Sequence, residues 1–481
     1  MQTGVVIRTL GVLLLLFSTT LIPPLAVSLI YGDGEFDHLS LTFGAALLAG
    51  ASLWLSLRGT LARIRHRDGF VIVALMWIAM SVLGALPFVL GLHVPFVDAL
   101  FEATSGYTTT GSTVLVGLDN LPPSILFYRQ EINWLGGIGV IVLAVALLPM
   151  LGIGGMQLYR AETPGPVKDE RITPRIAGTA RTLCVLYLWM TIACAFCFWL
   201  AGMTVFDAIG HSFATLATGG FSTHDASFSY FDSPAIEAVG VFFMLAAGIS
   251  FNVHFVVWRT LRISTYFRNT QTKAFLAVVG ALIACIALVL YETGTKSSAE
   301  DAIRAAAFEV ASVVTNTGFG VDDFSLWPYA LPALLIFGSI MGGCAGSTAG
   351  GMKVIRLVIV GKQGIAQIRQ LIHPRAVLPI RVDGQVVPEA VIDGVWGFFA
   401  MYVFVYVGTM ILLMMDGMDQ VTAFGAVAAC LNNLGPGLGD VAVNFAGVSP
   451  EGKLLLVFTM LFGRMEIFTF LVLLAPSFWK D

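Results

Sequence analysis

Residues 311–323 read ASVVTNTGFGVDD, and this stretch decides the fold because the chain repeats its pattern. Within an otherwise apolar region, Thr, Asn, Thr and two glycines stand together, and paired aspartates follow them. Related stretches read FEATSGYTTTGST at 101–113, HSFATLATGGFST at 211–223 and AVAACLNNLGPGLGD at 426–440. They recur about one hundred residues apart, and regular recurrence of this kind indicates internal repeats.

Each stretch contributes one key glycine. The third stretch, taken from 308 as FEVASVVTNTGFG, aligns with the first without a gap and places Glu102 over Glu309 and Gly111 over Gly318. In the second stretch either of two adjacent glycines could occupy that position, and the sequence does not distinguish between them. The key glycines are Gly111, Gly219 or Gly220, Gly318 and Gly435.

The composition is that of a membrane protein. Of 481 residues, 57% are hydrophobic and 12% are charged, and the mean hydropathy is +0.85, whereas a soluble domain carries about 25% charged residues. The net charge of −4 argues against a nucleic-acid partner. The sequence contains no GxxxxGK(S/T) phosphate-binding loop, no metal-enzyme spacing and no nucleophile–base constellation. We therefore expect neither an enzyme nor a bound cofactor.

Ten apolar runs approach the ~20 residues that a helix needs to cross a bilayer. They cover 5–31, 39–57, 70–92, 124–151, 182–203, 235–258, 274–291, 329–360, 389–415 and 453–477. These runs predict an all-α polytopic membrane protein with ten spans in a lipid bilayer.

Basic residues lie almost entirely on one side of these spans, at the termini and in the even-numbered gaps. The exceptions among the 26 Lys and Arg residues are Arg129, Lys296, Arg304 and Lys453 on the side of the odd-numbered gaps, and Arg464 inside the last span. Clusters at 58–68 and 362–375 carry most of the asymmetry. The positive-inside rule therefore places both termini in the cytoplasm.

The short segments before the glycine turns divide the chain into repeats. Each repeat is a span, a half-length helix with its turn, and a second span (M1–P–M2), so all four cross the membrane twice and share one orientation. Parallel repeats can close around an axis along the membrane normal. We expect a central pore in pseudo-four-fold symmetry, preceded by two N-terminal spans. The predicted regions are the N-terminal pair at 1–68 and pore repeats at 69–160, 161–268, 269–375 and 376–481.

The turns have the composition of an ion-selectivity filter. Non-helical backbone at membrane depth is tolerated where it lines a water-filled cavity, and rings of carbonyl oxygens can replace the hydration shell of a cation. Glycine reaches positive φ without a Cβ penalty, which lets successive carbonyls point at one axis. The candidate filter residues are Thr109, Thr110, Gly111, Ser112, Thr218, Gly219, Gly220, Phe221, Asn316, Thr317, Gly318, Phe319, Asn433, Leu434, Gly435 and Pro436.

The motifs TTTGS, TGGFS, TNTGFG and NLGPG resemble those of the Trk/Ktr/HKT superfamily of potassium uptake proteins. Ten spans, with two before the first repeat, are similar to its bacterial TrkH/TrkG branch. The resemblance implies a K⁺-selective pore, also permeable to Rb⁺, in each subunit of a homodimer in the bacterial inner membrane. It also implies a cytoplasmic, TrkA-like ring of nucleotide-binding subunits that gates the pore.

The fourth turn departs from the simplest potassium-channel pattern. Leu434 stands where the first and third turns have threonine, and Pro436 follows the key glycine. Four unequal strands should select less sharply than four identical ones. We therefore expect weaker rejection of Na⁺ than in a symmetric filter.

The eighth run contains GSIMGGCAGSTAGGMK at 338–353. Glycine weakens a helix by roughly 1 kcal/mol relative to alanine, so we predict a break that places a loop across the cavity below the filter. The alternative is close helix packing through small residues. The resemblance matches this segment to the intramembrane gating loop of the third repeat. The candidate gating residues in it are Gly342, Gly343, Gly346, Ser347, Thr348, Gly350 and Gly351.

Arg464 stands within LFGRMEIFTFLVLL at 461–474. An intramembrane arginine is costly and normally faces a cavity or a partner. If its helix starts near Lys453, Arg464 lies ~16 Å along it, close to mid-bilayer. It would then be a fixed positive charge below the filter that repels resident cations and slows throughput. A salt bridge to another helix is the alternative, and the resemblance favours the pore role.

Two transport mechanisms are compatible with these features. The first is a K⁺ pore gated by the loop and by a cytoplasmic regulator. The second is a symporter that couples K⁺ to Na⁺ or H⁺, which requires carboxylates inside the spans, and Asp393 and Glu466 are the main candidates. We expect three further polar residues to form hydrogen bonds between helices, namely Asn133, Asn252 and His254.

Overall fold

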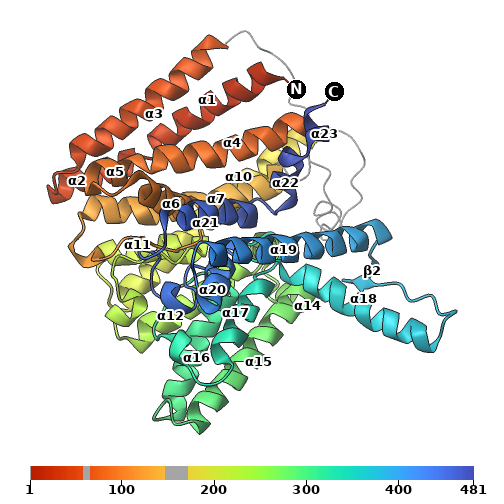
Figure 1. The fold of residues 1–481 in the computed structure, drawn as a ribbon. Helices are drawn as coiled ribbons and strands as arrows, with labels where there is room; N and C mark the ends of the chain where they lie inside the picture. Colours follow the sequence, from red (N-terminus) through yellow and green to blue (C-terminus); the bar gives the residue numbers. More distant parts are fainter. Residues whose placement is uncertain (1, 58–65, 147–171, 481) are drawn as a thin grey trace.

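The computed structural model describes residues 2–57, 66–146 and 172–480, and these residues form a bundle of helices (Figure 1). Most of the basic cluster at 58–68, the end of the predicted fourth span and the boundary predicted between 160 and 161 lie outside the described residues.

The N-terminal helices are α1 (Thr3–Thr19), α2 (Ile22–Tyr31) and α3 (Phe36–Ser56). The predicted first span is broken between α1 and α2, where two prolines occupy the first turn of α2, a position that does not need their missing N–H groups. Helices α1 and α3 pack backbone to backbone. A Cβ on Gly11 would lie 2.7 Å from the Trp54 nitrogen, and one on Gly50 would lie 2.8 Å from the Leu15 nitrogen. Glycine at both crossings therefore permits the close approach.

Four helix sets follow, each with a long helix, a short helix and a further helix. The first helices are α4 (His66–Gly84) with α5 (Leu86–Leu92), α10 (Ile172–Leu200), α15 (Thr270–Glu292) and α19 (Glu389–Met415). The short helices are α6 (Phe96–Tyr107), α11 (Val205–Ala217), α16 (Ala299–Val314) and α20 (Gln420–Leu431). The further helices are α7 (Pro123–Ala146), α12 (Pro234–Gly248) with α13 (Phe251–Thr260), α17 (Leu331–Met341), and α21 (Pro450–Arg464) with α22 (Phe468–Leu474).

The four sets contact one another in a cycle. Each short helix packs against the long helix that precedes it, and the further helix of each set also packs against the short helix of the next set. These contacts join α7 to α11, α12 to α16, α17 to α20 and, closing the cycle, α21 to α6. The first and last sets therefore lie side by side although they are far apart in the chain.

Local capping explains where three of the short helices begin. The side chain of Thr204 accepts a hydrogen bond from the Asp207 amide, and Ser298 accepts one from the Asp301 amide. Asp419 caps α20 in the same way. Such side chains satisfy N–H groups that the first turn of a helix leaves unpaired.

Six helices among the described residues are long and apolar enough to cross a membrane, or up to eight if each bent pair is one span. The bent pairs are α12 with α13, at 98°, and α21 with α22, at 118°. The predicted fourth and eighth spans are not among them. Helix α7 carries Arg129 and Glu131 near its start, and the apolar helix in the eighth run is Leu331–Met341. Ten spans thus stay a prediction.

The other elements connect or extend the sets. They are α14 (Ser264–Arg268), α18 (Val354–Ile372), α23 (Pro476–Trp479), η1 (Leu118–Asn120), η2 (Ser227–Tyr230), η3 (Phe324–Leu326) and η4 (Gly439–Val441), with a hairpin of β1 (Arg381–Val382) and β2 (Gln385–Val386) that pairs Arg381 with Val386. Helix α18 and the hairpin project from the bundle (Figure 1). The basic cluster at 362–375 lies mostly exposed on this projection.

Candidate ion-conducting site

The four glycine turns follow the ends of the four short helices and lie against one another in a closed ring. Each key glycine lies against the next turn around the ring. A Cβ atom added to the glycine would contact a carbonyl oxygen of that next turn, and this oxygen belongs to the residue just before the next key glycine. The four pairs are Gly111 with Gly219, Gly220 with Thr317, Gly318 with Leu434, and Gly435 with Thr110. The contacts run from the first turn to the fourth and back to the first.

The four turns also share one backbone conformation. The key glycines have φ between +69° and +103°, and the residue two positions before each has φ between +51° and +57°. Those earlier residues are Thr109, Thr218, Asn316 and Asn433. A β-branched or amide side chain at positive φ is uncommon and persists where its surroundings enforce it. Gly220, rather than Gly219, has the positive φ that corresponds to the other three glycines.

Hydrogen bonds repeat with the same regularity. In each turn, the amide between the two positive-φ residues donates to the carbonyl five residues earlier, at 2.8 Å in all four cases. The pairs are Thr110 with Ser105, Gly219 with Ala214, Thr317 with Ser312, and Leu434 with Ala429. Because these amides bond back to the short helix, they do not face the ring.

Side chains tie the fourth turn to the first. The Ser112 hydroxyl donates to the Gly435 carbonyl at 2.8 Å, and the Asn433 amide donates to the Thr110 hydroxyl at 2.9 Å. Asn433 also donates to the Met460 carbonyl of α21 at 3.1 Å. These bonds close the ring at the junction between the two ends of the chain.

The two phenylalanines that follow key glycines anchor the turns through their side chains. The Phe221 ring lies 4.1 Å from the Arg129 guanidinium carbon, and the Phe319 ring packs 4.6 Å from that of Phe228. Both are buried. At these two candidate filter positions the side chain is therefore a packing group.

Equivalent residues of the first three short helices hold the chain beyond each turn. Glu102 accepts from the Val114 amide at 3.0 Å, and Glu309 accepts from the Val321 amide at 2.8 Å. At the corresponding place in the second set, His211 Nε2 lies 3.0 Å from the Ser222 hydroxyl. The sequence aligned the two glutamates without giving them a role. A carboxylate at the same position of two short apolar helices is the signal that could have revealed it.

Arg129 is a structural residue that sequence reasoning missed. Its side chain, 1% exposed, donates from Nε to Glu102 at 2.8 Å and from Nη1 to the Ser222 carbonyl at 3.0 Å. Nη2 lies 3.2 Å from the Thr113 hydroxyl. The Arg129 guanidinium thereby links the first turn to the second through hydrogen bonds.

Two further ion pairs join neighbouring sets around the cycle. Arg304 of α16 donates from Nε to Glu237 of α12 at 2.6 Å, and Lys453 of α21 donates to Asp98 of α6 at 2.7 Å. Lys453 is buried, whereas the Arg304 side chain is 32% exposed. Together with Arg129, these pairs account for three of the four basic residues in the odd-numbered gaps, and the fourth, Lys296, pairs with Asp322 at 2.6 Å.

Replacing Arg129 with alanine should destabilise the protein strongly, because Glu102 would remain buried without its cation. Breaking a buried pair from one side costs about 3–5 kcal/mol, whereas Lys296→Ala removes its pair with Asp322, which is partly exposed on both sides, and should cost about 0–1 kcal/mol. Thermal unfolding of the purified protein in detergent measures both. Arg129→Ala combined with Glu102→Gln should recover part of the loss, and equal Tm values for the two single variants would contradict this role.

The predicted break in the eighth run is present. Helix α17 ends at Met341, α18 begins at Val354, and residues 342–353 between them are not helical. Gly342, Gly346 and Gly351 have φ of +64°, +75° and +72°. The alternative, a continuous helix packed through small residues, is therefore wrong.

The segment 342–353 contacts the ends of three other helices. The Thr348 hydroxyl donates to the Leu216 carbonyl of α11 at 2.9 Å, and the Cys344 amide donates to the Gly248 carbonyl of α12 at 2.8 Å. The Gly351 amide donates to the Asn432 carbonyl, after α20, at 3.1 Å. Leu216 and Asn432 lie just before the second and fourth turns, so the segment lies next to the ring.

Arg464 is the last residue of α21 and contacts this segment. Its guanidinium donates to the Thr348 carbonyl at 3.0 Å and to the Gly136 carbonyl of α7 at 3.2 Å, and the residue is 6% exposed. No acidic residue in the described part of the chain forms an ion pair with it, so the salt-bridge alternative does not hold there. Among the described residues, its hydrogen-bond acceptors are these two backbone carbonyls.

Comparison with known proteins bears on the identity of this site. The family model described as TrkH, cation transport protein, matches residues 38–480. The chain belongs to the TrkH family. It is 50% identical over the full length of both chains to the Trk system potassium uptake protein TrkH of Vibrio parahaemolyticus, and 48% identical over both full lengths to that of Escherichia coli K12. The E. coli protein TrkG is 38% identical over 99% of each chain.

A solved structure confirms the helical membrane fold. The crystal structure of the potassium transporter TrkH from V. parahaemolyticus matches with a TM-score of 0.93 and 48% identity over 100% of each chain. The resemblance to the Trk superfamily is thereby confirmed. Membership in a family of cation transport proteins gives the chain a transport function rather than a catalytic one.

Of the polar residues that we expected to bond between helices in this TrkH family member, His254 does so and Asn133 does not. His254 Nδ1 lies 2.7 Å from the Tyr266 hydroxyl. Neither amide atom of Asn133 has a hydrogen-bond partner within the described residues, although both are buried. A Cβ on Gly219 would lie 2.8 Å from the Asn133 amide nitrogen. Asn133 thus lies directly beside the second turn.

Proposed function

We propose that the protein is the K⁺-selective pore-forming subunit of a potassium uptake system, and that the ring of four turns is its selectivity filter. The closed cycle of glycine–carbonyl contacts carries this proposal, because a pore requires the four strands to share one centre. The names of its relatives, which are Trk system potassium uptake proteins, support the choice of ion. Rb⁺, which is close to K⁺ in size, should also pass.

The backbone chemistry of the ring suits a dehydrated cation. Two positive-φ residues in each turn redirect the chain so that carbonyl oxygens can face one axis, while the intervening amide bonds back to its own helix. The short helices end at the ring, and the C-terminal end of a helix carries partial negative charge. Carbonyl rings and negative helix ends both favour a cation over an anion.

In this proposal the four helix sets are four M1–P–M2 repeats around the pore. The contact cycle of the short helices supports this arrangement. The repeats would cover 69–160, 161–268, 269–375 and 376–481, after an N-terminal pair at 1–68. Ten spans in a bacterial inner membrane, with both termini cytoplasmic, complete the arrangement, and the basic projection of α18 supports that orientation.

The segment 342–353 and Arg464 form the gate in this proposal. The segment lies beside the second and fourth turns, and the Arg464 guanidinium bonds to its Thr348 carbonyl. A loop in this position obstructs ions, and a fixed positive charge repels them. A cytoplasmic TrkA-like nucleotide-binding ring would move the loop, and two subunits would form a homodimer. The resemblance to the Trk superfamily supports both partners.

Coupling of K⁺ to Na⁺ or H⁺ is the alternative, and its two candidate carboxylates support it poorly. Asp393 lies exposed in the second turn of α19. Glu466 is paired with Arg356 at 2.7 Å. A coupling carboxylate must bind and release its ion, and a salt-bridged or exposed one is poorly suited to that.

Ion uptake into liposomes distinguishes the two mechanisms. The purified protein in liposomes loaded with K⁺ should accumulate ⁸⁶Rb⁺ without any imposed Na⁺ or proton gradient, because a pore needs only the electrochemical gradient of the permeating ion. Uptake of ²²Na⁺ under the same conditions should be slower. Protein-free liposomes are the control. Rb⁺ uptake that occurs only when a proton or Na⁺ gradient is imposed would favour the symporter.

A further inference from the structure

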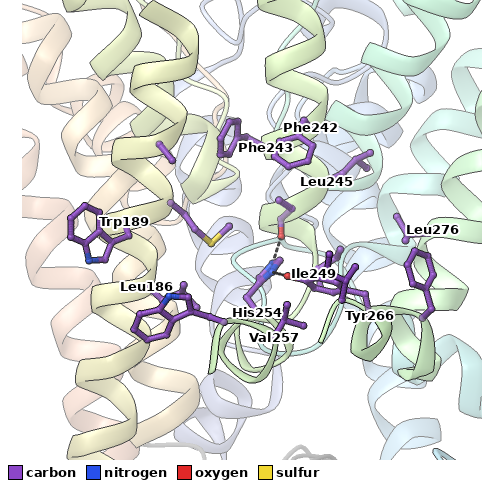
Figure 2. A pocket seen from close by; sticks show the side chains of 16 residues that line it. Leu186, Trp189, Phe242, Phe243, Leu245, Ile249, His254, Val257, Tyr266 and Leu276 are labelled. Atoms are coloured by element: carbon purple, nitrogen blue, oxygen red, sulfur yellow. Dashed lines mark hydrogen bonds between the residues drawn. The ribbon is translucent and has the colours of Figure 1, made fainter. Parts of the chain in front are cut away.

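An apolar pocket lies outside the ring, where the second and third helix sets meet. Its volume is about 640 Å³, within the range of about 300–1,000 Å³ typical of small-molecule sites. Helices α10, α12, α13, α14 and α15 contribute its walls. Figure 2 shows Trp189 and Leu186 on one side, Phe242 and Phe243 above, and Tyr266 and Leu276 on the other side. The outer helices of this pocket are candidate membrane spans, so it opens towards lipid.

His254 is the buried polar side chain among the residues that line the pocket, and both of its ring nitrogens are occupied. His254 bonds through Nε2 to the Ala246 carbonyl of α12 at 2.8 Å, and through Nδ1 to the Tyr266 hydroxyl of α14 at 2.7 Å (Figure 2). The imidazole therefore fixes the angle between α12 and α14 and offers no free ring nitrogen to a ligand. The remaining lining is almost entirely aliphatic and aromatic, which favours an apolar occupant.

The rim of the pocket has the features of a membrane interface. Because α13 is bent by 98° from α12, α13 runs across the end of the span rather than along it. Exposed Trp258 of α13 and exposed Phe267 of α14, which follows it, line the pocket. Aromatic residues of this kind gather at the level of lipid headgroups.

Residues 259–268, from the end of α13 through α14, carry positive charge without an ion-pair partner among the described residues. Arg259 follows the lining residue Trp258, Arg262 precedes Ile263, and Arg268 follows Phe267. All three arginines are exposed, and none forms a hydrogen bond or ion pair with the part of the chain that the structure describes. Residues 249–274 contain no Asp or Glu. The nearby carboxylate of Asp383 is bonded to Thr270 instead, at 2.8 Å from its amide.

We propose that this pocket binds one anionic phospholipid, with an acyl chain in the cavity and the phosphate at Arg259, Arg262 and Arg268. An apolar cavity beside a cationic rim at headgroup level matches the two halves of such a lipid, and basic pockets between spans on the cytoplasmic side bind lipid headgroups. The proposal rests on the proposed membrane orientation but not on the ion that the pore conducts. A zwitterionic lipid lacks the net charge that the rim favours.

The bound lipid would act on the gate, because the break between α12 and α13 is bonded to the segment 342–353. The Cys344 amide donates to the Gly248 carbonyl at 2.8 Å, and the Phe251 amide donates to the Gly346 carbonyl at 3.0 Å. Ala246 and Ile249, on either side of Gly248, line the pocket. An acyl chain packed against Ala246 and Ile249 would stabilise the bend between α12 and α13. That bend in turn positions the segment 342–353 through the two hydrogen bonds.

Lipid retention tests the site directly. The full-length protein would be purified in mild detergent with equal amounts of phosphatidylglycerol and phosphatidylcholine, and bound lipid measured by native mass spectrometry. We expect retention of phosphatidylglycerol by the unaltered protein, and an at least about tenfold loss in the Arg259→Gln/Arg262→Gln/Arg268→Gln variant, since each surface arginine contributes to binding of anionic lipid. The matched control, Arg369→Gln/Arg375→Gln, removes exposed arginines of the projection and should retain the lipid.

A second variant tests the cavity without changing charge. Ala193 lines the pocket, and Ala193→Trp should fill it and displace the lipid with the arginines intact. Equal retention by the triple-glutamine variant and its control would overturn the site. Displacement of the lipid by inorganic phosphate alone would show a phosphate site rather than a lipid site. Unchanged lipid retention in Ala193→Trp, with a change in subunit number, would show that a second copy of the chain covers the pocket.

The effect on the gate has a separate readout. In liposomes of phosphatidylcholine with increasing phosphatidylglycerol, Rb⁺ flux through the unaltered protein and through the Arg369→Gln/Arg375→Gln control should change with the anionic fraction. The triple-glutamine variant should not respond. Surface potential acts on all three proteins alike, so an identical response in all three, or none in any, would overturn the link to the gate. Retention of lipid without ion flux would refute the proposed function and leave the site intact.

Discussion

Gly318→Ser should lower the discrimination between K⁺ and Na⁺ by at least about tenfold. Gly318 has φ of +85°, and a Cβ there would abut the Leu434 carbonyl oxygen of the next turn. Backbone strain of this kind costs about 1–3 kcal/mol, and each 1.4 kcal/mol corresponds to about a factor of ten. The serine must move either its own turn or that carbonyl, so the ring loses the geometry that matches K⁺. The ratio of ⁸⁶Rb⁺ to ²²Na⁺ uptake in liposomes measures the effect.

A matched glycine controls for the added side chain. Gly280 lies on the exposed face of α15, and a Cβ there would meet nothing within 4 Å. Gly280→Ser should leave the ratio of Rb⁺ to Na⁺ uptake unchanged. If Gly318→Ser is folded by its elution profile and Tm yet keeps the selectivity of the unaltered protein, the turns are not the filter. The same comparison at Gly220 tests whether all four turns contribute.

Arg464→Ala should raise the flux of Rb⁺ by about tenfold. Removing a charge near the ion path removes a repulsion of about 1–2 kcal/mol at an effective dielectric constant near 20, and each 1.36 kcal/mol off a barrier is about tenfold in rate. The change also removes the donor to the Thr348 carbonyl, which frees the loop. Both effects act in the same direction. Initial rates of ⁸⁶Rb⁺ uptake, normalised to the amount of reconstituted protein, measure the combined effect of the lost charge and the lost hydrogen bond.

Arg464→Lys separates the two contributions. Lysine keeps the positive charge but cannot present the planar pair of donors that reaches Thr348 and Gly136 together. If the charge dominates, the lysine variant should conduct like the unaltered protein. If the bond to the loop dominates, it should conduct like the alanine variant. Flux that falls or stays constant in Arg464→Ala, in protein of normal Tm, would refute the gating role.

Much of the fold could be predicted from local sequence. The apolar runs, the short helices and the glycine turns were all recognisable because each depends on residues close together in the chain. The break at 342–353 was predictable for the same reason, since six glycines in a short segment weaken any helix. The bends were not predicted. The runs at 235–258 and 453–477 are each broken, at 98° and 118°, although their hydropathy is continuous.

The site was predictable in its members but not in its contacts. The sequence left Gly219 and Gly220 as alternatives, and the backbone dihedral distinguishes them. It aligned Glu102 with Glu309 but placed Arg129 among charges outside the membrane, whereas one guanidinium joins the first two turns. Arg464 was predicted to face a cavity or an acid. Its two carbonyl partners come from α7 and from the loop, which are 328 and 116 residues away in the chain.

The sequence by itself determined that this chain enters a membrane, that it carries four glycine turns after short helices, and that one helix breaks. Each of these follows from transfer energies and backbone preferences, which act over a few residues. Tertiary structure decided that the turns close into a ring, which glycine lies against which carbonyl, and where the buried arginines find their acceptors. Most of these contacts join residues about one hundred or more positions apart, so they depend on how the helices pack and produce no local sequence pattern.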